Sequence, residues 1–377
     1  MKNRDIFLVT TSIKKTFPAK TKKKILLAGE WCKDDVDKLF LSKYQIQTLS
    51  YHWDDEKKRS QDSLYLKKVY YKLENDLSLY LNKVHQTKFS KRYWSIIISP
   101  WLSRFIIFFF DKYSVIKKIK KKFRVTNTKI ISFTNHNELV PQNIKDANYK
   151  FQSHHWNHNI FSLLIQKLLP SKNKISEVKK KFKIETPKKN KNKNFLKQKL
   201  IKLYCYVFNF LISSNGSFVI NSYLGFLGEI LLNFKLNNNL KINLPLDFNQ
   251  KFNIEKKLRR HKLKNYINDD EFIKFLKDIM PLNIPAYYLE GYKNLSKTCL
   301  QVPWMKNPNL IFTSNSHLGD EVFNFWTAHQ LNKTKIPLVY GQHGGTFFTS
   351  KHSVEREIEI AHADKFLAWG NSKESSS

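Results

Sequence analysis

A His-Gly-Gly turn at residues 340–345 (YGQHGG) is the segment of this sequence best suited to proton transfer. It follows a short apolar run, and open α/β sheets place their ligands at the carboxyl ends of such strands. His343 is the side chain here that can exchange a proton near neutral pH. Gln342 could position a sugar or phosphate oxygen, and Gly344 and Gly345 would let a ligand approach the backbone. The alternative is a structural turn, and a P-loop is excluded because no GK[ST] follows.

An acidic segment at residues 355–364 (EREIEIAHAD) could supply the partner of that histidine. On a helix, Glu355 and Glu359 share one face, and His362 follows three positions after Glu359. A helix that begins near the turn can direct one carboxylate back toward His343, which would create an acid/base couple. The alternative is an ordinary charged helix face.

Small polar residues end the preceding apolar run, in the sequence TSNS at 313–316. Asn315 and Ser316 could bind hydroxyl or phosphate oxygens of a substrate. The same residue types also cap helices, and the sequence leaves both interpretations open.

Two loops place tryptophan beside carboxylates, GEWC at 29–32 and YHWDD at 51–55. A tryptophan ring can stack on the apolar face of a sugar while carboxylates accept hydrogen bonds from its hydroxyls. The candidate sugar-binding residues are Glu30, Trp31, His52, Trp53 and Asp54. The alternative is partly buried aromatic packing.

Three histidines fall within the sequence HHWNH at 154–158. A metal site would need a further ligand, and no Asp, Glu or Cys stands nearby to complete it. We therefore predict no metal, and expect Trp156, Asn157 and His158 to form a polar loop at the substrate cleft.

The elements that must position these residues alternate between strand and helix. Short apolar runs at 310–313, 337–340 and 365–369 are separated by helical patterns at 320–331 and about 354–363. This β-α-β-α-β order predicts a doubly wound parallel sheet of the Rossmann-like α/β class. Further strands are expected at 24–28, 46–50, 129–133 and 217–221. Further helices are expected after a cap at Asp62, over 223–234, and after Asn268 with Glu271 in capping-box-like spacing.

Two apolar segments, 94–110 and 203–228, are each interrupted by Pro, Arg, Asn or Ser, so we expect buried core rather than membrane spans. Residues 171–202 are rich in Lys, Asn and Ser. Their first two-thirds are predicted to be a solvated or disordered insertion.

The net charge of +35 comes almost entirely from lysine. Arginine, the better residue for bidentate recognition of phosphates and bases, is scarce, so we expect no specific nucleic-acid partner. Clustered lysine suits an anionic membrane surface, where no exact geometry is needed. The three scattered cysteines and the N-terminus without an apolar core indicate the reducing cytoplasm, with the inner face of the membrane as the expected surface.

The ordered motifs FLVTTS, LLAGEWC, YHWDD, RYW with SPW, WNH, IFTSNS, YGQHGG and EIAHADKFLAWG resemble a family of transferases found in O-antigen and other surface-polysaccharide gene regions. The resemblance runs from Phe7 to Gly370 and thins out in the lysine-rich insertion. It implies a fold of the GT-B kind, in which two Rossmann-like domains face each other across a cleft. Residues 1–370 would be the N-terminal, acceptor-side domain, with a helical region at about 60–120 and the insertion at about 171–200. Residues 371–377 would begin the interdomain linker, so the donor domain is expected to be missing from this chain.

The C-terminal part is also similar to capsule-type ulosonic-acid transferases and polymer glycerophosphotransferases. That resemblance implies that His343 and Glu359 are the catalytic residues and that Asp364 introduces a strand. The sequence departs from the pattern at two places: Ile358 stands where a histidine is usual, and Phe347-Phe348 replaces Tyr-Gly.

The expected function is glycosyl transfer from a nucleotide-activated sugar to a glycan or lipid-linked acceptor. No cofactor beyond the donor is expected, and no metal, because no DxD-like motif stands at a strand end. One alternative is a polymer phosphotransferase on the same fold. Another is a non-catalytic basic protein that binds membranes or RNA.

Overall fold

Two parallel sheets form the framework of the computed structural model, which describes residues 5–133, 136–169, 174–180, 203, 215–236, 243–246, 248–345, 347–350 and 352–370. The first sheet has the order β3-β2-β1-β4-β5 and the second has the order β6-β7-β8-β9. All neighbouring strands in both sheets are parallel. The predicted Rossmann-like α/β class is confirmed.

The strand bounds follow the apolar runs in the sequence. The first sheet contains β1 (Ile6–Val9), β2 (Lys24–Leu27), β3 (Ile46–Thr48), β4 (Val125–Phe133) and β5 (Lys174–Lys180). The second contains β6 (Asn215–Ile220), β7 (Asn307–Thr313), β8 (Leu338–Gly341) and β9 (Lys365–Leu367). β1 and β8 are buried along their whole length, as expected for strands covered by helices on both faces of a parallel sheet.

The sequence pattern predicted strands but assigned them to one sheet. The structure divides them between two, because periodicity identifies a strand without identifying its neighbours.

Two long helices follow the first three strands. α2 (Glu56–His85) begins after Asp55, whose side chain accepts a hydrogen bond from the backbone N–H of Lys58. The prediction that Asp62 caps this helix is therefore wrong. Asp62 lies inside α2, where it accepts a hydrogen bond from Trp53 Nε1 at 2.8 Å.

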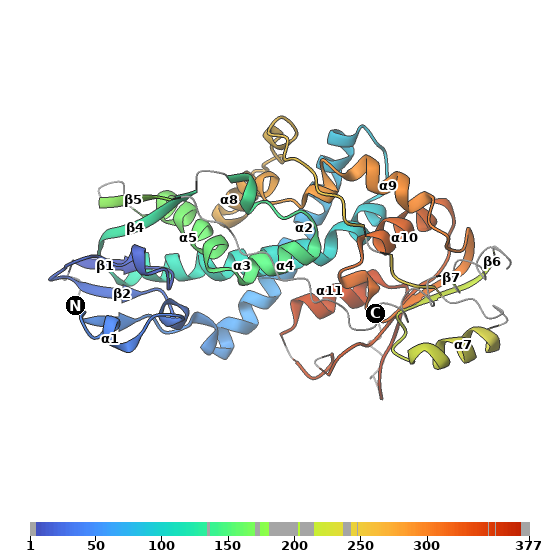
Figure 1. The fold of residues 1–377 in the computed structure, drawn as a ribbon, viewed down its shortest axis with the longest axis horizontal. Coiled ribbons are helices and arrows are strands. Elements are labelled where there is room, and N and C mark those ends of the chain that lie inside the picture. Colours follow the sequence, from blue (N-terminus) through green and yellow to red (C-terminus); the bar gives the residue numbers. More distant parts are fainter. Residues whose placement is uncertain are drawn as a thin grey trace.

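α3 (Lys91–Lys122) joins the two halves of the molecule. It packs on α2, on α5 (His154–Leu168) behind the first sheet, and on α10 (Glu321–Lys333) and α11 (Val354–His362) of the second sheet. In Figure 1, α3 extends from one sheet toward the other. Pro100 lies within the helix and does not end it.

Among the described residues, α3 is the one helix long and apolar enough to cross a membrane by length and composition. However, 78% of its most apolar window is buried inside the protein. The expected buried core at 94–110 is therefore what the structure contains, and the aromatic side chains of Trp94, Trp101 and Phe105 supply much of it.

The remaining helices are shorter. They are α1 (Lys38–Leu41), α4 (Ile144–Gln152), α7 (Gly225–Lys235), α8 (Glu271–Ile279) and α9 (Tyr292–Leu300). α8 is capped by Asp270, one residue before the Glu271 of the predicted capping box.

Two predicted segments differ from the structure. Residues 174–180 of the expected solvated insertion form β5, which pairs with β4 along its whole length. Residues 170–173 and 181–202 lie outside the described part of the chain.

The second segment is 203–228, in which residues 204–214 also lie outside the described part of the chain. The helix that follows β6 there is not buried core, because Leu227 is 73% exposed.

Candidate active site at the carboxyl edge of the second sheet

Two neighbouring strands of the second sheet and helix α11 bring titratable side chains to one edge. β7 ends at Thr313 and is followed by a short 3₁₀ turn (Ser316–Leu318) that carries His317. β8 ends at Gly341, two residues before His343. Because both strands are parallel, their carboxyl ends meet at the same edge, and α11 places Glu359 beside it.

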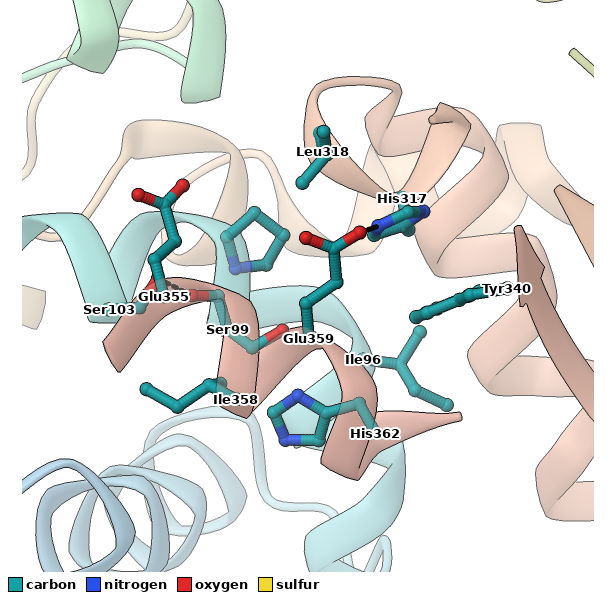
Figure 2. Close-up of a pocket in the computed structure, with 11 residues that line it drawn as sticks. Ile96, Ser99, Ser103, His317, Leu318, Tyr340, Glu355, Ile358, Glu359 and His362 are labelled. Carbon is teal, nitrogen blue, oxygen red and sulfur yellow. Dashed lines mark hydrogen bonds and ion pairs between the residues drawn. The ribbon is translucent and has the colours of Figure 1, made fainter. Parts of the chain in front are cut away.

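Glu359 is the centre of the cluster. His317 Nε2 lies 2.7 Å from Glu359 Oε1, and His343 Nε2 lies 2.8 Å from the same oxygen. Arg356 Nη1 donates to the other oxygen, Oε2, at 3.2 Å. Figure 2 shows the Glu359 carboxylate pointing at the His317 ring. The contact between His343 and Glu359 that the sequence analysis expected is therefore present.

Hydrogen bonding determines the charge of Glu359. Burial raises the pKa of its carboxyl, but the hydrogen bonds from His317 and His343 outweigh burial and lower that pKa to about 2. The group is thus a carboxylate at neutral pH, with donors on both oxygens.

His317 is held neutral. Burial lowers the pKa of its imidazole, against the opposing effect of Glu359. Its Nδ1 is buried and has no hydrogen-bond partner among the described residues, which fits a ring protonated on Nε2. The neutral ring can therefore donate to Glu359 without carrying a charge.

Aromatic contacts fix the orientation of these side chains. The His317 ring stacks on Tyr340, with ring centroids 3.9 Å apart and an interplanar angle of 11°. Phe347 meets the His343 ring edge-on at 5.0 Å, and the Arg356 guanidinium lies 4.6 Å from the Phe347 centroid. Such packing restricts the rotamers of a site before any ligand arrives.

A small cavity lies between α3 and α11 on one side of Glu359. Its volume is about 20 Å³, room for about one water molecule. Ser99, Ser103, His317, Glu359 and His362 are among its lining residues, and Figure 2 shows them around the opening. The cavity is too small for a sugar, so a substrate would have to approach His343 from another side.

The same three side chains could in principle ligate a metal. The ligand atoms of His317, His343 and Glu359 all lie within 4.8 Å of one another, and two histidines with one carboxylate are a known metal-binding set. However, Arg356 Nη1 lies 3.1 Å from His343 Nε2 and 3.2 Å from Glu359 Oε2. A divalent cation would be repelled by that guanidinium, so these residues would hold a metal only if Arg356 moved away.

The other residues of the His-Gly-Gly turn have different roles. Gln342 is buried and braces the turn: its amide donates to the Gly344 carbonyl at 2.8 Å and accepts from the Trp369 N–H at 2.8 Å. Both of its polar atoms thus have protein partners, which argues against the predicted contact with substrate. A side chain at Gly344 or Gly345 would meet no atom of the described residues within 4 Å, so space remains beside this backbone.

The polar residues after β7 bond to residues of the loop that follows β6. Asn315 donates to the Tyr223 hydroxyl at 2.7 Å, and Ser316 accepts from Asn221 at 2.7 Å. Neither side chain caps α10, since Asp320 does. Both lie at the same sheet edge as His317, but Ser316 is buried.

The predicted polar loop at 154–158 is instead the first turn of α5, and two of its five side chains are buried. Trp156 is fully buried against Phe151, and Asn157 donates to the carbonyls of Phe151 and Ser153. His158 is buried between Thr10 Oγ1 (3.1 Å) and the Ile131 N–H (3.0 Å). These residues belong to α5 and do not form the predicted polar loop. The burial of Trp156 and His158 argues against their predicted contact with substrate.

The tryptophan loops lie at the carboxyl edge of the first sheet and line no part of the cavity beside Glu359. Trp31 donates to the Thr10 carbonyl at 3.2 Å and stacks on Phe161, while Glu30 is exposed and pairs with Lys33.

In the second loop, His52 is buried against Trp53, and Asp54 is exposed at the rim of a separate pocket. Neither Trp31 nor Asp54, both candidate sugar-binding residues, lines the cavity beside Glu359.

Sequence reasoning did not single out His317 or Arg356. His317 follows Ser316 directly, so a search for titratable residues one turn beyond each strand end would have found it.

The neighbouring acidic residues of α11 form other contacts. Glu355 pairs with Arg104 of α3, and Glu357 pairs with Lys67 of α2.

Asp364 precedes β9, and its carboxylate accepts a hydrogen bond from the Leu338 N–H at 2.8 Å, which ties that strand to β8.

Comparison with known proteins identifies one family. A family model described as LIC12162 family transferase matches residues 6–376. No curated protein and no solved structure matches the chain.

Proposed function

We propose that this chain, which belongs to the LIC12162 family of transferases, transfers a sugar from a nucleotide-activated donor to a hydroxyl of a glycan or lipid-linked acceptor. The observation that carries the proposal is the 2.8 Å contact between His343 Nε2 and the buried, ionised carboxylate of Glu359. A histidine oriented by a carboxylate at the carboxyl edge of a parallel sheet is suited to remove a proton from an attacking hydroxyl.

The tautomer of His343 decides which nitrogen acts as the base. Nε2 cannot donate to Glu359 and accept from Arg356 at the same time. The negative charge on Glu359 favours donation, which leaves Arg356 to donate to Oε2. The lone pair then resides on His343 Nδ1, which has no hydrogen-bond partner in the described part of the chain.

In the proposed step, His343 Nδ1 takes the proton of the acceptor hydroxyl. As the hydroxyl oxygen bonds to the anomeric carbon, the bond from that carbon to the phosphate oxygen of the nucleotide breaks, and its electron pair leaves with the nucleotide. The imidazolium that forms is stabilised by the Glu359 carboxylate.

His317 and Arg356 are positioning residues in this scheme. Their hydrogen bonds keep Glu359 ionised and fixed, so that it can orient His343. The open backbone at Gly344 and Gly345, with Asn315 at the same edge, is the proposed contact for sugar or phosphate oxygens.

Two considerations support a role in surface-polysaccharide synthesis at the cytoplasmic face of the membrane. One is the resemblance of the sequence motifs to transferases of such gene regions. The other is the lysine excess, which would favour an anionic membrane surface.

The test is a turnover assay of the full chain with a panel of nucleotide sugars and of nucleotide-activated alcohol phosphates, following release of the nucleotide. We expect a nucleotide sugar to be turned over, with His343→Asn and Glu359→Gln lowering kcat by about 10²–10⁴-fold. Glu357→Gln is the matched control, because Glu357 lies on the same helix and pairs with Lys67 away from the cluster.

If the chain turns over only the nucleotide-activated alcohol phosphates, the protein is a phosphotransferase, and His343 would be the base in that reaction instead. Full activity of the His343→Asn variant would show that His343 is not the catalytic base.

A further inference from the structure

A large basic pocket lies at the carboxyl edge of the first sheet and has no part in the chemistry proposed at Glu359. Its volume is about 1040 Å³, at the upper end of the range for small-molecule sites. It is formed by the loop after β3, the start of α2 and the last three turns of α3. The pocket is thus formed by two segments that lie more than fifty residues apart in the sequence.

Six lysines line this pocket against two aspartates, Asp54 and Asp55. The lysines are Lys58, Lys117, Lys118, Lys120, Lys121 and Lys122. Asp55 is already engaged as the N-cap of α2. The pocket therefore carries a strong excess of positive charge, which raises the local concentration of anions.

Not all of these ammonium groups are neutralised within the protein. Lys58 pairs with Asp62 at 2.6 Å, and Lys117 pairs with Glu271 at 2.8 Å. Lys118 donates to the carbonyl and hydroxyl of Ser50. Lys120, Lys121 and Lys122 form no ion pair with any described residue, so three charges remain for a ligand.

A buried histidine in the pocket wall is the second, independent observation. His52 is 3% exposed, and both of its ring nitrogens lack a hydrogen-bond partner. Its nearest charged neighbour is Asp111, whose Oδ1 lies 3.7 Å from Nε2, beyond hydrogen-bond distance. A buried polar group without a partner among the described residues is costly. Both ring nitrogens are covered in this structure, so a ligand oxygen in the pocket would satisfy one of them after the His52 ring turns outward.

The helix dipole accounts for only part of this arrangement. Lysines in the last turn of a helix are favoured by the negative end of the dipole, which applies to Lys120, Lys121 and Lys122. It does not explain why Lys58 of another helix faces the same space, nor why His52 has no partner there.

We propose that this pocket binds the phosphoryl group of an anionic ligand, with Lys120, Lys121 and Lys122 as its cationic contacts and His52 as a hydrogen-bond donor. Ammonium groups on flexible stems bind phosphate as point charges and need no bidentate geometry. The aromatic side chains of Tyr51, Phe110 and Tyr113 line the same pocket and would contact the remainder of the ligand. The phosphoryl group could belong to a free phosphate ester or to a lipid headgroup, and the experiment separates the two.

Binding is measured on the full chain at physiological ionic strength, where interactions between distant exposed charges are largely screened. Inorganic pyrophosphate is titrated by calorimetry, and vesicles of phosphatidylcholine with or without phosphatidic acid are tested by co-sedimentation. The variant is Lys120→Gln/Lys121→Gln/Lys122→Gln. The matched control is Lys256→Gln/Lys257→Gln/Lys262→Gln, which removes the same charge from three exposed lysines that do not line the pocket.

We expect saturable binding that weakens about tenfold or more in the pocket variant and by less than about twofold in the control, since charge-assisted contacts dominate such sites. The His52→Asn variant should also bind the ligand more weakly than the unchanged protein. Circular dichroism checks that this variant is folded.

Loss of pyrophosphate binding in the pocket variant would identify a free phosphate ester as the source. Loss of phosphatidic-acid binding without any pyrophosphate binding would identify a lipid headgroup. Equal weakening in both triple variants, or no saturable binding of either probe, would overturn the proposal.

Discussion

Glu359 accepts hydrogen bonds from two histidines and an arginine, and this number of donors sets its protonation state. A carboxylate with several donors is stabilised in its charged form even when it is buried. The consequence for His343 is a fixed partner that remains negative over the whole physiological pH range.

Replacing one donor tests this account of Glu359. We expect His317→Phe to keep the stack on Tyr340 and to raise the pKa of Glu359 from about 2 toward its ordinary value, because one of two hydrogen bonds to Oε1 is lost. The pKa of Glu359 is measured from its carboxyl carbon chemical shift in an NMR titration. His329→Phe is the control, since His329 bonds to Tyr93 and Ser296 and not to Glu359. An unchanged Glu359 titration in His317→Phe would contradict the account.

The glycines around the turn are predicted to respond differently to substitution. A Cβ at Gly341 would lie 2.6 Å from Ser314 Oγ and 3.1 Å from Phe312 Cζ, whereas at Gly345 it would meet nothing within 4 Å. We expect Gly341→Ala to cost about 1–3 kcal/mol of unfolding free energy by overpacking, and Gly345→Ala to cost less than about 0.5 kcal/mol. Urea denaturation of both variants measures the difference. Similar losses in the two would show that crowding at Gly341 is relieved at little cost.

At the scale of elements, α8 is held to α2 by a buried charged group. Lys277 is fully buried on α8, with Nζ 2.6 Å from Asp76 of α2 and 2.7 Å from Asp269. Lys72 of α2 also pairs with Asp269. Buried ions of this kind are tolerated only when each charge has its partner.

Lys277→Met is therefore expected to destabilise the protein by about 3–5 kcal/mol, because it leaves buried carboxylates without their counter-ion. Lys274→Met on the exposed face of the same helix should change stability by less than about 0.5 kcal/mol. Thermal unfolding measures the loss of stability in each of the two variants. A small effect of Lys277→Met would mean that water or Lys72 compensates for the missing charge.

At the scale of the whole molecule, three neutral histidines, one buried and two half-buried, lie between elements. Burial lowers the pKa of His158 to about 3, and that of His85 and His329 to about 4, from an ordinary value of 6.5. Below pH 6.5 the unfolded chain takes up protons that the folded chain does not.

The stability of the folded protein should therefore fall as the pH is lowered from about 6.5 toward 4. Urea midpoints at pH 7, 6 and 5 measure this, in a range above the ordinary pKa of carboxyl groups. We expect His329→Phe to make the decline shallower, because one of the three groups is removed. A midpoint that is constant from pH 7 to pH 5 would show that these histidines accept protons in the folded state.

The sequence by itself determined the local features of this protein. Apolar runs and their spacing predicted the α/β class, the last three strands with the helices between them, and the approach of Glu359 to His343. These follow from short-range geometry, since a strand, a turn and the next helix are consecutive along the chain.

The tertiary structure alone decided what separate segments do together. It divided the strands between two sheets, brought His317 to Glu359, and turned Trp156 and His158 into the core. It also assembled the lysines of α3 beside His52. Burial and contact between distant segments depend on which faces pack together, and a pattern along one segment does not contain that information.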